Sequence, residues 1–66
     1  MLKLTRRELE VARLAAKGWD NALVAAALGV APRTVKNHLQ SAFRKLNVKD
    51  RVQLALQADR LSDPPR

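Results

Sequence analysis

The sequence predicts an all-α fold, a compact domain of four short helices. Two observations lead to this prediction. Val, Ile and Thr do not alternate with polar residues at a period of two, which is the pattern of a half-buried strand. Apolar residues recur instead at helical spacing, in segments separated at Gly18, Gly29 and Asn47. The 66 residues provide one domain with one small core, which we place over residues 1–61.

The first helix is expected over residues 6–17. Thr5 and Glu8 have the Thr-x-x-Glu spacing of a capping box, in which each side chain accepts a hydrogen bond from the other residue's backbone N–H. Gly18 follows the last expected turn and is suited to a left-handed C-terminal cap. The helix therefore carries both a start signal and a stop signal.

The second and third helices are expected over residues 21–28 and 32–46. Asp20 is a favourable N-cap for the second helix, and Gly29 ends it. Pro32 suits the first turn of the third helix, where its missing N–H is no loss. The inner face of the second helix is predicted to consist of Val24, Ala27 and Leu28.

The third helix has two chemically distinct faces. At about 100° per residue, its apolar residues fall on one arc, which we expect to face the core. That arc consists of Val35, Leu39, Ala42, Phe43 and Leu46. The opposite arc is basic or carries amides, and it consists of Arg33, Lys36, Asn37, Gln40 and Arg44.

The fourth helix is expected over residues 51–61, with Asp50 as its N-cap. It is apolar on more than one side, and a small domain cannot easily bury both sides. One stripe consists of Leu54, Ala58 and Leu61. The second set is a candidate dimer interface, or else scattered surface residues, and consists of Val52 and Leu56 with Asp59 nearby. Residues 62–66 contain two prolines and are expected to be a disordered tail.

The charge balance favours a polyanionic partner. Lys and Arg number 13 against 6 Asp and Glu, for a net charge of +7. A merely solvated surface and an anionic membrane surface are the alternatives. The sequence has no apolar run long enough to span a bilayer and no signal-peptide pattern, so we expect a cytoplasmic protein with no membrane partner.

The segment from residue 24 to residue 39 joins a short helix, a turn at Gly29 and a basic helix. With the small Ala25 where two helices would cross, this spacing favours a helix-turn-helix, whose second helix enters the DNA major groove. An ordinary helical hairpin is the alternative. Amide and basic side chains near the start of the third helix suit base edges, and we expect base contacts from Lys36, Asn37 and Gln40. Phosphate contacts are expected from Arg33, Thr34, His38, Arg44 and Lys45.

Catalysis is not expected from this sequence. The chain has one histidine and no cysteine, and no nucleophile–base or paired-carboxylate arrangement is evident. We therefore expect no metal site and no cofactor. Two structural predictions concern other residues: Trp19 covers the small core, and Glu8 pairs with Arg51 between the first and fourth helices.

Several motifs together resemble a known family. They are Leu4-Thr5-Arg6-Arg7-Glu8-Leu9-Glu10-Val11, Gly18-Trp19-Asp20-Asn21, Val24-Ala25, Thr34-Val35-Lys36-Asn37-His38, Lys45-Leu46-Asn47-Val48 and Arg51. This combination resembles the LuxR-type helix-turn-helix domain, the C-terminal half of NarL/FixJ-type response regulators and of quorum-sensing regulators. The resemblance covers residues 4–61, nearly the whole chain.

The resemblance implies that the third helix reads the major groove, that the fourth mediates homodimerisation, and that a receiver or ligand-binding domain precedes the domain. Carried over by position, Lys36, Asn37 and Gln40 correspond to base contacts, and Asn21, Thr34 and Lys45 to backbone contacts. The chain departs from the family at Ala31, where Ser or Thr is usual. The third helix is therefore expected to lack its N-cap hydroxyl, at a cost of about 1 kcal/mol.

These observations predict sequence-specific binding of double-stranded DNA by a bacterial-type transcription regulator that acts as a dimer. One alternative is a promoter-binding domain like region 4 of a sigma factor, which a strictly one-to-one complex with DNA would favour. The other is a protein-interaction module, which the absence of salt-sensitive binding to duplex DNA would favour.

Overall fold

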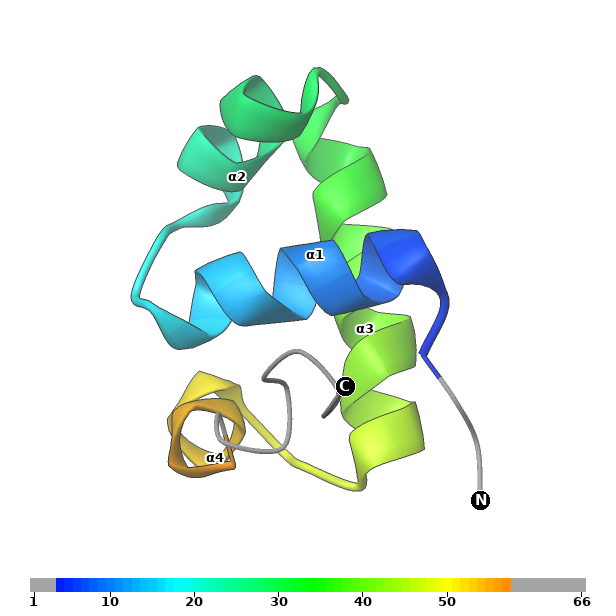
Figure 1. The fold of residues 1–66 in the computed structure, drawn as a ribbon, viewed down its shortest axis with the longest axis vertical. Coiled ribbons are helices and arrows are strands. Elements are labelled where there is room, and N and C mark those ends of the chain that lie inside the picture. Colours follow the sequence, from blue (N-terminus) through cyan, green and yellow to red (C-terminus); the bar gives the residue numbers. More distant parts are fainter. Residues whose placement is uncertain (1–3, 58–66) are drawn as a thin grey trace, which may run out of the picture.

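The computed structural model describes residues 4–57, which form four helices and no strand (Figure 1). They are α1 (Arg6–Ala16), α2 (Asn21–Leu28), α3 (Pro32–Leu46) and α4 (Arg51–Leu56). The all-α fold is confirmed, and the first three helices match the expected bounds to within one residue. The fourth ends earlier than expected, with Gln57 as its C-cap. The rest of that expected helix, residues 58–61, and the expected tail, residues 62–66, lie outside the described residues.

The start of α1 is held by the expected capping box. The backbone N–H of Thr5 donates to Glu8 Oε1 at 2.9 Å, and the backbone N–H of Glu8 donates to Thr5 Oγ1 at 3.1 Å. Two backbone donors at the N-terminal end of the helix thus have side-chain partners without help from any other element.

The helix α1 occupies the centre of the fold. It packs against α2, α3 and α4, and α2 also packs against α3. In Figure 1, α1 crosses the long α3, while α2 and α4 lie on opposite sides of α1. This arrangement buries one face of α3 against α1 and leaves the opposite face of α3 in solvent.

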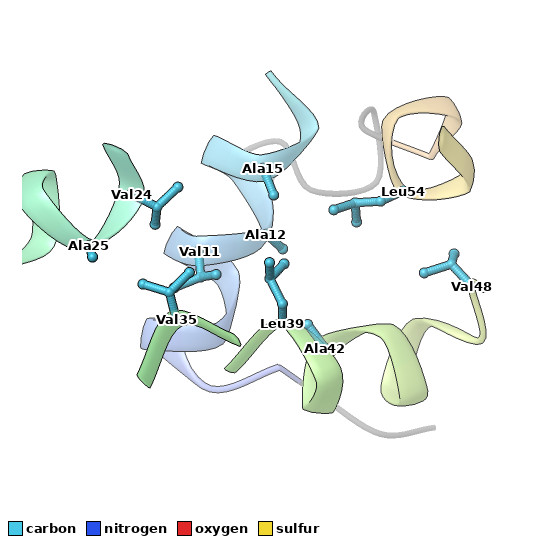
Figure 2. Packing of buried hydrophobic residues seen from close by; sticks show 10 residues of the cluster. All are labelled: Val11, Ala12, Ala15, Val24, Ala25, Val35, Leu39, Ala42, Val48 and Leu54. Carbon is cyan, nitrogen blue, oxygen red and sulfur yellow. The ribbon is translucent and has the colours of Figure 1, made fainter. Parts of the chain in front are cut away.

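All four helices contribute side chains to one core (Figure 2). Its buried members are mostly Val and Ala, small residues that let the helix axes approach closely. They are Val11, Ala12, Ala15, Val24, Ala25, Val35, Leu39, Ala42, Val48 and Leu54. Trp19 is half-buried and packs against this cluster, in agreement with its expected covering role.

The inner face of α2 differs from the prediction at one position. Ala27 is exposed, and Ala25 is buried in its place beside Val24. Because α2 packs against both α1 and α3, the side of α2 that carries Ala25 is covered, while Ala27 remains in solvent. The burial of Ala25 agrees with the separate expectation that this small residue lies where two helices cross.

Candidate nucleic-acid interface

The connection between α2 and α3 is a tight turn at Gly29. Gly29 adopts φ 70° and ψ 34°, the left-handed region, and its N–H donates to the carbonyl of Ala25. The N–H of Val30 donates to the same carbonyl at 3.0 Å. A Cβ at Gly29 would meet no atom within 4 Å, so the demand for glycine is conformational and not a matter of space.

The entry to α3 lacks a side-chain cap, as the sequence predicts. Ala31 has the extended conformation of an N-cap, φ −75° and ψ 149°, and makes no side-chain hydrogen bond. Its carbonyl accepts from the N–H of Thr34 at 2.9 Å and from that of Val35 at 3.2 Å. Pro32 stands in the first turn, where no N–H is needed. No side chain therefore caps the start of α3, and backbone hydrogen bonds close its first turn.

The two faces of α3 lie as expected. Val35, Leu39 and Ala42 are buried. The predicted polar arc is exposed along its whole length, and it consists of Arg33, Lys36, Asn37, Gln40 and Arg44. We call these five residues the α3 polar face. Thr34 and His38 are half-buried along its edge. The structure thus brings all three expected base-contacting residues onto one accessible surface.

The formally charged side chains from the start of α2 to Lys49, in the loop after α3, are all cationic. Residues 21–49 contain five Lys or Arg and no Asp or Glu. The α3 polar face therefore has no acidic residue of its own helix, or of the turn before it, to repel a phosphate. Basic and amide side chains on one exposed helix are the chemistry that duplex DNA needs from a protein.

Lys45, an expected phosphate contact, is engaged inside the domain. Its Nζ donates to Glu8 Oε1 at 2.8 Å, and its side chain keeps 23% of its exposure. Ser41 Oγ donates to the other carboxylate oxygen, Glu8 Oε2, at 2.5 Å. Lys45 therefore ties α3 to the start of α1, in addition to any contact it makes with phosphate.

The Glu8 carboxylate is buried and strongly acidic. The hydrogen bond from Lys45 lowers its pKa most, followed by those from Ser41 and from the Thr5 backbone, and together they outweigh the effect of burial. The resulting pKa is about 2, compared with an ordinary 4.5. Glu8 is thus ionised at neutral pH and joins α1 to α3 electrostatically.

The predicted Glu8–Arg51 ion pair is wrong. Arg51 Nη1 donates instead to the carbonyl oxygen of Trp19 at 3.1 Å, and Nη2 donates to Asn21 Oδ1. The physical reason is the placement of the helices: α3 covers the α1 end that carries Glu8, whereas α4 lies near the opposite end (Figure 1). Asn21, an expected phosphate contact, is thereby linked to α4.

The second apolar set of α4 is on the surface. Val52 is 68% exposed and Leu56 80% exposed, while Leu54 is fully buried between them in sequence. A shallow groove separates Val52 and Leu56 from Trp19 and the end of α1. Asp59, the third residue expected at a dimer interface, lies outside the described residues.

The described residues hold neither a metal cluster nor a membrane span. Within residues 4–57, no group of three His, Cys, Asp or Glu side chains is placed to hold a metal ion. No helix in that range reaches the length and hydropathy that crossing a bilayer requires.

Comparison with known proteins places these observations in a family. The family model for bacterial regulatory proteins of the luxR family matches residues 2–58. The transcriptional regulatory protein DegU of Brevibacillus brevis is 42% identical over 55 residues, which cover 83% of this chain and 23% of that protein. The response regulator protein VraR of Staphylococcus aureus is also 42% identical over 55 residues, 83% of this chain and 26% of that protein.

A putative HTH-type transcriptional regulator of Aeromonas salmonicida is 46% identical over 52 residues, covering 79% of this chain and 26% of that protein. The chain thus spans about a quarter of the length of these relatives. No solved structure matches it significantly.

Proposed function

Because the chain belongs to the luxR family of bacterial regulatory proteins, we propose that it binds specific sites on double-stranded DNA through α3 and so regulates transcription. The single observation that carries this proposal is the α3 polar face, whose five basic or amide side chains are exposed on the side of α3 opposite the core. Relatives named as transcriptional regulators support the same role. Such a role belongs in the cytoplasm, where bacterial DNA lies.

Lys36, Asn37 and Gln40 are the proposed base-contacting residues. Lys36 and Asn37 lie in the first half of α3, and Gln40 lies about one turn further along, just past its midpoint. The N-terminal part of a recognition helix contacts base edges in the major groove. Asn and Gln each offer an acceptor and a donor to adenine, and Lys donates to guanine. All three are exposed, and within residues 4–57 their side chains make no hydrogen bond that would compete with DNA.

Phosphate contacts are proposed to surround these three residues. Arg33 and Arg44 lie at the two ends of the α3 polar face, and Thr34 and His38 lie along its edge. Lys45 and Asn21 can also contribute: the Lys45 ammonium has donors beyond the one that Glu8 accepts, and Arg51 engages only the amide oxygen of Asn21, not its N–H donors. Attraction to phosphate would make affinity fall steeply with salt.

We further propose that the domain binds as a homodimer through the exposed side of α4, around Val52 and Leu56 and with Asp59. Two large apolar side chains at 68% and 80% exposure on a helix of six residues are an unfavourable surface unless a partner covers them. A two-fold dimer would place two copies of α3 on half-sites about one helical turn apart. The whole regulator would carry a further domain, such as the receiver domain of a response regulator, because the relatives are about four times as long.

The proposal is tested by selecting bound sites from random duplex DNA and then comparing variants on the selected site. The double variant Lys36→Ala and Gln40→Ala should weaken specific binding by about tenfold or more for each lost base contact. It should weaken binding to unrelated DNA only about as much as the loss of one charge does. The control variant, Lys49→Ala, removes one exposed cation outside α3 and should affect both kinds of DNA equally.

Equal losses on specific and unrelated DNA in the double variant would contradict base reading by α3. A selection that returns no preferred site would contradict sequence specificity itself. A palindromic site would support the dimer, whereas a single asymmetric half-site and a one-to-one complex in sedimentation would contradict it.

A further inference from the structure

Arg51 occupies an electrostatically unfavourable position. It is the first residue of α4, where the helix macrodipole is positive and disfavours a cation. Asp50, not Arg51, supplies the cap, because Asp50 Oδ1 accepts from the N–H of Gln53 at 3.0 Å. Neither capping nor the macrodipole of α4 therefore explains a cation at this position.

The contacts of Arg51 lie in a different part of the fold. One guanidinium nitrogen donates to the carbonyl oxygen of Trp19 at 3.1 Å, and the other donates to Asn21 Oδ1. These acceptors flank Asp20, whose side chain caps α2 by accepting from the N–H of Leu23 at 2.8 Å. A guanidinium is planar and rigid, so it holds two acceptors at a fixed spacing in a way that an ammonium cannot.

The same contact orients the Asn21 amide. A guanidinium has donors only, so the amide must present its oxygen to Arg51. The amide nitrogen, with two N–H donors, is then turned away from Arg51 at the first position of α2. Without Arg51, the amide could rotate about its terminal torsion and present either atom, since Asn rotamers about that bond are broad. The contact with Arg51 therefore leaves the N–H donors of the Asn21 amide, and not its oxygen, available to a group that binds at the start of α2.

We propose that Arg51 is a positioning residue for DNA binding: it holds the Asn21 amide so that its N–H groups face a phosphate of the DNA backbone. This rests on the proposed function, in which Asn21 is a phosphate contact. Arg51 lies on α4, the helix that also carries Val52 and Leu56, so the proposed dimer helix and the proposed phosphate contact share one hydrogen-bonded link.

The experiment is a double-mutant cycle with Arg51→Met and Asn21→Ala, measured by fluorescence anisotropy on the selected duplex over a series of salt concentrations. Arg51→Met should weaken binding about fivefold to tenfold, less than the loss of a whole hydrogen bond to a charged phosphate, because the Asn21 amide remains but is no longer held in orientation. The same change in the Asn21→Ala background should have less than about a twofold effect. Lys49→Met is the matched control, because it removes a cation two residues away whose side chain makes no hydrogen bond to α2 within the described residues.

The salt series separates positioning from direct contact. If Arg51 acts through Asn21, the slope of log affinity against log salt stays as in the wild type, because no phosphate contact by a cation is lost. A fall of the slope by about 0.9, with equal effects of Arg51→Met in both backgrounds, would mean that Arg51 binds phosphate itself and would overturn the proposal. An unchanged affinity in Arg51→Met would overturn it as well.

A second variant keeps the proposal testable if Arg51→Met fails to fold. Arg51→Lys keeps the charge but loses the rigid fork, so it should weaken binding nearly as much as Arg51→Met if positioning is the role. Wild-type affinity in Arg51→Lys would contradict that role, because charge alone would then suffice.

Free-protein NMR keeps this proposal separable from the proposed function. The side-chain ¹⁵N–¹H signals of Asn21 should shift and broaden in Arg51→Met without any DNA present. If the wild-type domain failed to bind duplex DNA, the proposed function would fail. If the domain bound DNA but the Asn21 signals were the same in both proteins, only the role of Arg51 would fail.

Discussion

Replacing Glu8 by Gln is the most informative perturbation of the fold. Gln keeps the carbonyl oxygen that accepts from Thr5, so the capping box can persist. What it removes is the negative charge that Ser41 contacts at 2.5 Å and Lys45 at 2.8 Å. The variant therefore isolates the electrostatic link between α1 and α3 from the cap of α1.

The size of the effect follows from the pKa of Glu8. One pKa unit corresponds to about 1.36 kcal/mol, so a pKa lowered from 4.5 to about 2 sets an upper limit near 3 kcal/mol at neutral pH. Water screens part of this, because the Lys45 side chain is 23% exposed. We expect Glu8→Gln to lower the free energy of unfolding by about 2 kcal/mol at pH 7, a large share of the roughly 5 kcal/mol expected for a domain of this size.

The pH dependence has a definite sign. A carboxylate whose pKa is lower in the folded state stabilises the fold fully above its unfolded pKa and loses that contribution as pH falls towards the folded pKa. The difference in unfolding free energy between wild type and Glu8→Gln should therefore be constant above about pH 5 and shrink between pH 4.5 and about 2. Other carboxylates titrate in both proteins and cancel in this difference.

Urea unfolding followed by circular dichroism measures these values across the pH range. Glu10→Gln is the matched control: its side chain is 43% exposed and pairs with Arg7 at 3.4 Å on the surface of α1. That variant should cost about 0.5 kcal/mol or less. If Glu8→Gln lowered the free energy of unfolding by the same amount at pH 2.5 as at pH 7, the electrostatic reasoning would be refuted. The loss would then come from altered hydrogen-bond geometry and not from the missing charge.

Three further changes probe the core, the α3 entry and α4. Leu54→Ala removes the fully buried side chain that joins α4 to the core and should cost about 2–5 kcal/mol in chemical unfolding, so a loss under about 1 kcal/mol would mean that α4 docks by other contacts. Ala31→Ser adds the missing N-cap hydroxyl to a residue already in extended conformation, and it should raise the melting temperature by about 4–8 °C; no increase would show that backbone geometry already satisfies the entry of α3. Leu56→Glu should leave helicity intact and weaken dimer formation on DNA in sedimentation, whereas Leu23→Glu, at an exposed apolar residue of α2, should not; equal effects of both would contradict the α4 interface.

Local signals in the sequence were sufficient for the elements and for the α3 polar face. The N-caps at Thr5, Asp20 and Asp50 act over three residues, so their hydrogen bonds could be predicted without knowledge of the fold. Helical periodicity separated the two faces of α3 in the same way. It also separated the buried Leu54 from the exposed Leu56 two residues later.

Pairings between distant residues could not be predicted in this way. Glu8 was expected to pair with Arg51, but it pairs with Lys45, 37 residues away in sequence. Charge alone makes the two cations equivalent partners for Glu8. The one available signal for a different role was the unfavourable position of Arg51 at the start of α4.

The sequence by itself determined four helices, a glycine turn at Gly29, an uncapped entry at Ala31 and a basic outer face on α3, because each depends on residues within about one turn of one another. Only the tertiary structure decided which helix covers which end of α1. That placement joins Lys45 to Glu8 and Arg51 to Asn21. The physical reason is that side chains reach only a few ångströms, so the identity of a long-range partner is settled by how the helices pack and not by the charge that each residue carries.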